Sequence, residues 1–141
     1  MNKRLLTLLS ICIAAISSFS LNATEPEATE EPELIGLYFH AKWCSACKKI
    51  DSNLDEALAT SSRPDFKLVT LDLDNKATQH ESESIADAVG LLDIYKTTGV
   101  KTGFILLVDA TTHEVIDKID RKDKSDAMAA KLDKALAAAK S

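Results

Sequence analysis

Two cysteines three positions apart, Cys44 and Cys47, are the residues of this sequence whose types and spacing best suit a chemical reaction, namely thiol-disulfide exchange. In a C-x-x-C pair one thiolate can open a disulfide, and the second can then displace the first partner by forming a ring. The pair follows a short apolar run and precedes a helical pattern, which places Cys44 at the start of a helix. There the unpaired N–H groups and the positive end of the helix dipole stabilise a thiolate. We therefore predict Cys44 as the attacking sulfur and Cys47, one turn further in, as the resolving sulfur.

Two other roles for the pair stay open on spacing alone. The cysteines could form a permanent structural disulfide, or they could supply two ligands of a copper or zinc site in a binding module. A structural zinc site needs further ligands, and the sequence offers His40, His80, His113 and carboxylates but no second pair at ligand spacing. We therefore assign no metal. His40, near the end of the preceding strand, could tune the thiolate, join a metal, or only cap the strand at the surface.

The elements around the pair follow from the periodicity of apolar residues. Residues 34–39 form a continuous apolar run of strand length. From the cysteines onward, apolar residues recur every three or four positions, which predicts a helix. Pro64 and Asp65 break that pattern, and residues 66–74 alternate as in a second strand. The apolar stripe of the helix consists of Cys47, Ile50, Leu54 and Leu58.

The second half of the sequence predicts one more helix, a hairpin and a terminal helix. Residues 75–83 are polar and are assigned to a loop. A helix over 84–96 follows, with Ile85, Val89 and Leu92 at helical spacing, kinked near Gly90 and closed by Gly99. The alternating or dense apolar runs 104–108 and 115–119 predict a β-hairpin. A final helix over 125–140 carries Met128, Leu132 and Leu136 on one stripe. This order predicts an α/β domain with a mixed central sheet and helices on both faces.

Residues 41–48, Ala-Lys-Trp-Cys-Ser-Ala-Cys-Lys, identify the chain as similar to the thioredoxin superfamily. The resemblance extends from about Leu34 to Ala139 and implies a thioredoxin-like fold. Within the superfamily the segment looks most like the C-terminal periplasmic domain of the membrane disulfide reductase. The resemblance gives Cys44 as nucleophile, Cys47 as resolving cysteine and Trp43 as an aromatic wall beside the sulfurs. The alternative for Trp43 is packing against the edge of the sheet.

The sequence departs from the superfamily at two positions. Tyr38 stands where thioredoxin has a buried aspartate that assists proton transfer, and a tyrosine with an ordinary pKa near 10 is a poor base. Thr102 and Gly103 stand where the superfamily has a cis-proline opposite the cysteines. A cis bond without proline costs roughly 3 kcal/mol, so we expect a trans bond and a differently shaped loop. Such a loop could leave the sulfurs more open to metals, or let a partner backbone approach closely.

The N-terminal segment predicts export. Residues 1–23 combine two early basic residues, an apolar run and a small-residue end, which is the layout of a secretory signal peptide. An uncleaved membrane anchor, or lipid attachment at Cys12, are the alternatives. Residues 24–33 are rich in Glu and Pro and predict an extended tether. Residues 34–141 then form the thioredoxin-like domain, and we expect a periplasmic or otherwise exported protein.

Charge and cysteine count exclude several classes of function. Without Lys3 and Arg4 the 17 basic residues fall to 15, against 22 acidic residues, so a basic nucleic-acid surface is absent. Without Cys12, which lies in the predicted signal peptide, two cysteines remain, and two cannot build a disulfide framework. We predict a thiol-disulfide oxidoreductase, leaning towards reductase, that needs no cofactor because the sulfurs carry the electrons. Its expected partners are proteins with disulfides and one redox partner protein. We expect a monomer without stable membrane association after cleavage.

Overall fold

The computed structural model describes residues 31–141, so the predicted signal peptide and most of the tether lie outside the described residues. Four strands and four helices follow one another along this part of the chain. In order they are β1 (Leu34–His40), α1 (Ser45–Ala59), β2 (Phe66–Asp72), α2 (Lys76–Ala88), α3 (Leu92–Thr98), β3 (Phe104–Asp109), β4 (Val115–Asp120) and α4 (Ser125–Ala139).

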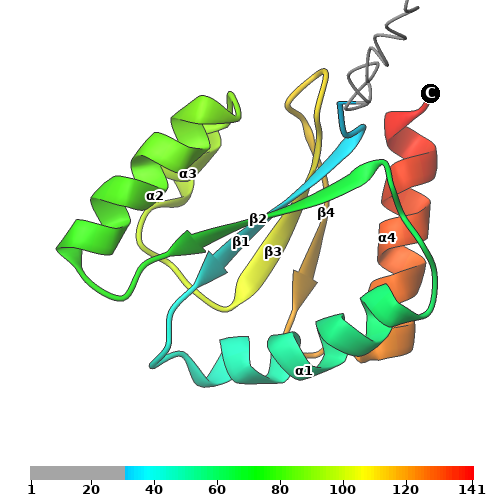
Figure 1. Ribbon diagram of the computed structural model, residues 1–141, viewed down its shortest axis with the longest axis horizontal. Helices are drawn as coiled ribbons and strands as arrows, with labels where there is room; N and C mark the ends of the chain where they lie inside the picture. Colours follow the sequence, from blue (N-terminus) through cyan, green and yellow to red (C-terminus); the bar gives the residue numbers. More distant parts are fainter. Residues whose placement is uncertain (1–30) are drawn as a thin grey trace, which may run out of the picture.

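The four strands form one mixed sheet in the order β2-β1-β3-β4. β1 pairs in parallel with β2 and antiparallel with β3, and β3 pairs antiparallel with β4. α1 and α4 pack on one side of the sheet, and α2 with α3 packs on the other (Figure 1). The predicted fold class is therefore confirmed: a thioredoxin fold with a mixed sheet between two layers of helices.

β1 lies in the middle of both cores, which explains why its sequence is apolar without interruption. Successive side chains of a strand point to opposite faces of the sheet. Leu34 and Tyr38 enter the core beneath α1 and α4. Leu37 and Phe39 enter the core beneath α2 and α3, where the Phe39 ring stacks 5.0 Å from that of Phe104. Both ends of β1 are thus fixed by packing, and its carboxyl end leads directly to the cysteines.

The predicted helix over 84–96 is wrong in its bounds and in its buried face. Two helices occupy this region, because α2 begins at Lys76 and the chain turns at Gly90, whose φ is +75°, before α3 begins. The predicted stripe residue Ile85 is 42% exposed, whereas Ser82 and Ala86 are buried. Gly99 ends the second helix as predicted.

A capping box explains why the polar stretch 75–83 is helical. The Asn75 side chain accepts hydrogen bonds from the N–H groups of Ala77 and Thr78, and the Thr78 hydroxyl accepts one from the Asn75 N–H. These bonds satisfy backbone donors that a helix start otherwise leaves unpaired. The buried Ser82 hydroxyl donates to the carbonyl of Asp72, 2.8 Å away. A polar residue therefore faces the sheet here, and apolar periodicity could not reveal the helix.

The remaining elements agree closely with their prediction. β2 ends two residues early, at Asp72, but Val69 and Leu71 face one core as the alternation predicts. In α4, Met128 and Leu132 are fully buried and Leu136 packs against them. Among the described residues, no helix combines the length and the apolar character needed to cross a bilayer.

Candidate active site

Cys44 is the N-cap of α1, one position before the first helical residue. Its backbone is extended, with φ −78° and ψ 109°, and its N–H donates to the carbonyl of Ala41 at 3.0 Å. The Cys44 Sγ accepts a hydrogen bond from the Cys47 N–H at 3.2 Å. The sulfur thus takes the place that a serine or aspartate oxygen usually occupies at an N-cap. An anion at this position faces the positive end of the helix dipole.

The surroundings of Cys44 favour its thiolate. Burial by itself raises the pKa of this thiol, since the residue is only 6% exposed. Hydrogen bonds to the sulfur from the Cys47 thiol, from Thr102 and from the N–H groups of Cys47 and Ala46 outweigh burial and lower the pKa below its ordinary value. Hydrogen bonds that reach the charged form stabilise it. Thr102, a predicted site residue, therefore lies where it can support the nucleophile.

Cys47 has the opposite character. It is fully buried in the core between β1, α1 and α4. Burial first, and then its hydrogen bond to Cys44, raise the pKa of its thiol to about 11. The Cys47 thiol therefore stays protonated near neutral pH, and the negative charge of the pair resides on Cys44. This asymmetry supports the predicted roles of the two sulfurs.

Limited alkylation should distinguish the two thiols. With iodoacetamide near pH 7, we expect Cys44 to be labelled at least about tenfold faster than Cys47, because the thiolate is the reactive form. As pH rises, labelling of Cys44 should reach half of its plateau below the ordinary thiol pKa, while labelling of Cys47 should still increase towards pH 11. Peptide mapping by mass spectrometry measures both rates. Faster labelling of Cys47 would contradict the assignment.

Gly103 packs directly against the cysteines. Its N–H donates to the carbonyl of Phe39 at 2.9 Å, and its φ is +92°. A Cβ at this position would lie 2.8 Å from the Ala46 Cβ and 3.3 Å from the Cys44 Sγ. The expectation of an open loop is therefore wrong: because the glycine lacks a side chain, the backbone closes on the sulfurs and both cysteines are buried.

Trp43 and His40 flank the pair in different ways. Trp43 is 64% exposed beside Cys44, which does not fit packing against the sheet edge. His40 ends β1, and its Nε2 lies 3.4 Å from the Oδ2 of Asp51 on α1. The His40 ring also meets the Tyr38 ring edge to face, with centroids 5.2 Å apart. His40 therefore contacts a carboxylate rather than a sulfur.

Asp51 is a polar contact of this site that the sequence did not reveal. The Tyr38 hydroxyl donates to the Asp51 Oδ1 at 2.8 Å and also lies 3.2 Å from the carbonyl oxygen of Cys47. In sequence Asp51 belonged to the polar face of a helix, like its neighbour Asp55. The only available signal was its position four residues after Cys47, which places both on one side of α1.

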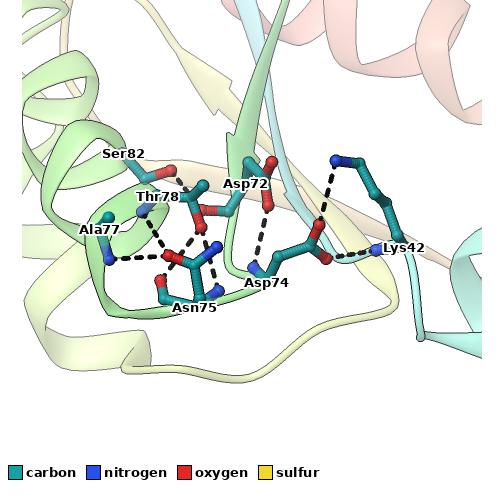
Figure 2. A network of polar contacts seen from close by, with 7 residues as sticks. All are labelled: Lys42, Asp72, Asp74, Asn75, Ala77, Thr78 and Ser82. Atoms are coloured by element: carbon teal, nitrogen blue, oxygen red, sulfur yellow. Dashed lines mark hydrogen bonds and ion pairs between the residues drawn. The ribbon is translucent and has the colours of Figure 1, made fainter.

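A second unpredicted residue, Asp74, fixes the loop before the cysteines (Figure 2). Its Oδ1 accepts from the Lys42 N–H at 2.6 Å, and its Oδ2 lies 3.4 Å from the Lys42 Nζ. The Asp74 N–H in turn donates to Asp72 at 2.9 Å. The turn after β2 thus holds the turn after β1. A carboxylate that accepts from a backbone N–H is a stronger anchor than the exposed ion pair with Lys42.

The described residues offer the cysteines no metal-binding partners. Across residues 31–141, no three side chains of the His, Cys, Asp or Glu type are arranged to hold a metal ion. The two cysteines are free thiols. Cys44 at the helix N-cap, with the fully buried Cys47 thiol behind it, is the arrangement that the spacing first indicated.

Comparison with known proteins agrees with this geometry. The thioredoxin family model matches residues 21–102, more than half of the chain and inclusive of both cysteines. Among solved structures, thioredoxin-2 of the malaria parasite, described as a component of its protein secretion machinery, is 25% identical; the match covers 72% of this chain and 82% of that one, with a TM-score of 0.49. Another malarial protein is 24% identical, with 73% and 97% covered and a TM-score of 0.48. No curated protein matches the sequence. The chain belongs to the thioredoxin family.

Proposed function

We propose that this protein is an exported thiol-disulfide reductase that acts on protein disulfides. The observation that carries the proposal is the asymmetry of the pair: Cys44 has a lowered pKa at a helix N-cap, and Cys47 is a buried thiol with a pKa of about 11. Membership of the thioredoxin family supports the same reaction class.

The reaction would proceed in two exchange steps. The Cys44 thiolate attacks one sulfur of a substrate disulfide, forms a mixed disulfide and releases the other substrate sulfur as a thiolate. The Cys47 sulfur then bonds to the Cys44 sulfur and releases the second substrate sulfur. Two electrons pass from the protein dithiol to the substrate, and both released thiolates take up protons. A redox partner protein must then reduce the Cys44–Cys47 disulfide, since residues 31–141 contain no cysteine besides these two.

The direction and the location of the reaction rest on the sequence. An exported compartment such as the periplasm is kept oxidising by separate proteins, so a further small thioredoxin-like protein there is more useful as a reductant. The signal-peptide pattern of residues 1–23 supports export. The family match begins at residue 21, after the apolar run, which fits a leader outside the domain. We propose a monomeric enzyme that is free of the membrane once the leader is removed.

Insulin reduction tests the proposal. With dithiothreitol as electron donor, purified protein should accelerate insulin precipitation well above the uncatalysed rate, and its Cys44–Cys47 couple should equilibrate with glutathione at one defined potential. We expect a potential on the reducing side, near that of thioredoxin at about −270 mV. A couple near −120 mV would indicate an oxidase. A protein that neither cycles nor accelerates the reaction would be a binding module.

A further inference from the structure

The buried thiol of Cys47 needs a base, and the described structure shows where one lies. Cys47 has no exposed surface and a thiol pKa of about 11, so its sulfur is protonated when a mixed disulfide forms on Cys44. The attack requires the thiolate. Because burial is the largest cause of the raised pKa, the difficulty persists when Cys44 is bonded to substrate. Direct loss of the proton to water is hindered by the same burial.

Tyr38 and Asp51 connect this buried thiol to solvent. Tyr38 is 3% exposed, and its hydroxyl lies against Cys47, donating to the carbonyl of that residue at 3.2 Å; its hydrogen bond to the Cys47 side chain also lowers the pKa of the thiol. The same hydroxyl donates to the Asp51 Oδ1 at 2.8 Å. The side chain of Asp51 is 46% exposed, so its carboxylate reaches solvent. β1 supplies the tyrosine and α1 the aspartate, and Cys47 lies one helical turn before Asp51 on the same side.

We propose that Asp51 accepts, through the Tyr38 hydroxyl, the proton that Cys47 loses when it resolves the mixed disulfide. This inference rests on the proposed function. As the bond between the Cys47 and Cys44 sulfurs forms, the bond from Cys44 to the substrate sulfur breaks, and the substrate leaves as a thiolate with the electron pair. The Cys47 proton passes to the Tyr38 oxygen while the Tyr38 proton passes to Asp51. Asp51 then releases its proton to water.

The properties of Tyr38 fit a relay rather than a base. Burial, and then the hydrogen bond to Asp51, raise the pKa of its phenol far above the ordinary value. The phenol therefore never needs to ionise: it accepts one proton as it donates another. The Tyr38 hydroxyl is hydrogen-bonded to Cys47 itself, whereas Asp51 acts through Tyr38 and is a positioning residue for the proton.

Few other charged groups face this path. His40 Nε2 lies 3.4 Å from the Asp51 Oδ2 and is the one basic group in the described residues that contacts this carboxylate; its ring also meets the Tyr38 ring, with centroids 5.2 Å apart. Cys44 neighbours Cys47 from the start of α1. β3 and α4 contribute apolar side chains to the same core, among them Ile105 and Met128. Within the described part of the chain, Asp51 is thus the ionisable side chain to which the Tyr38 hydroxyl donates its hydrogen bond.

A two-phase thiol assay tests the proposal. Reduced protein is mixed in a stopped-flow instrument with 5,5′-dithiobis(2-nitrobenzoate), whose coloured thiolate is released first by Cys44 and then again when Cys47 resolves the adduct. In Asp51→Asn we expect an unchanged first phase and a second phase slowed at least about tenfold near pH 7. The rate of the second phase in this variant should rise about tenfold per pH unit towards pH 11, because only Cys47 that has ionised without help can attack. The second phase of the wild-type protein should depend less on pH. Tyr38→Phe should behave like Asp51→Asn.

Two further variants separate proton transfer from a structural effect. Asp51→Glu keeps a carboxylate and should restore most of the second phase. Asp55→Asn removes the same charge one turn further along α1, at an exposed position, and should leave both phases unchanged. An Asp51→Asn second phase equal to wild type, or a slower one with the wild-type pH profile, would overturn the proposal. Absence of the first phase in wild type would overturn the proposed function and this inference with it.

Discussion

Replacing Cys47 with serine should convert the protein into a trap for its substrates. The first attack by Cys44 is retained, because its N-cap position and the hydrogen bonds from Thr102 and Ala46 are unchanged. The second attack is lost, so mixed disulfides on Cys44 should persist instead of turning over. Insulin reduction should fall to the uncatalysed rate. Non-reducing electrophoresis of the variant after exposure to exported proteins, followed by mass spectrometry, should show adducts that disappear with dithiothreitol.

Cys44→Ser provides the matched control. Serine is a preferred N-cap residue, so α1 should keep its start and the variant should fold normally. It should form no adducts through Cys47, because that thiol is fully buried and protonated. Adducts on Cys47 in this variant, or none on Cys44 in Cys47→Ser, would contradict the assignment of the two roles.

Gly103→Pro should destabilise the protein strongly, although proline is the family's residue in this loop. Proline fixes φ near −65°, whereas Gly103 has φ +92° and uses its N–H to bond the carbonyl of Phe39. We expect a loss of about 3 kcal/mol or more in the free energy of unfolding, measured by urea denaturation. Proline is also not needed to cover the sulfurs, because both cysteines are already buried, and its Cβ would lie 2.8 Å from the Ala46 Cβ.

Gly99→Ala separates backbone strain from steric contact. Gly99 also has positive φ, +68°, but a Cβ there meets no atom within 4 Å. Alanine at Gly99 should cost about 1–3 kcal/mol, because φ +68° with ψ −162° is a backbone conformation that side chains other than glycine rarely adopt. Alanine at Gly103 should cost clearly more, since its Cβ would press on Ala46 and on the Cys44 sulfur. It should also slow the attack by Cys44. Equal costs at the two glycines would show that the close contact with the cysteines is absent.

Two functional assignments remain predictions: the role of Trp43 beside the substrate, and export by the signal-peptide pattern of residues 1–23. The tryptophan faces solvent beside Cys44, where a substrate must approach, yet its role as an aromatic wall is untested. Residues 1–23 lie outside the described part of the chain. Trapped partners from the Cys47→Ser experiment would bear on both, because their location and their contact residues can be identified directly.

The sequence by itself determined the order of most elements and the chemistry of the cysteine pair. β1 is apolar throughout because both of its faces are buried, and α4 carries an apolar stripe because one of its faces is buried. Local periodicity was therefore enough to predict both elements. The position of Cys44 at a helix start followed from the change of pattern after Trp43. These features depend on residues within one or two turns of one another, and short-range spacing carries that information.

Only the tertiary structure decided the remaining contacts of the site. The first part of α2, residues 76–83, was missed because its inward face carries Ser82, whose polar group is satisfied by the carbonyl of Asp72 from another element. Asp51 and Asp74 look like ordinary surface acids in sequence, and become significant through partners on β1 and its loop. The fit of Gly103 against Cys44 joins residues almost sixty positions apart. Such contacts depend on how the sheet and helices pack, which no local pattern of apolar and polar residues encodes.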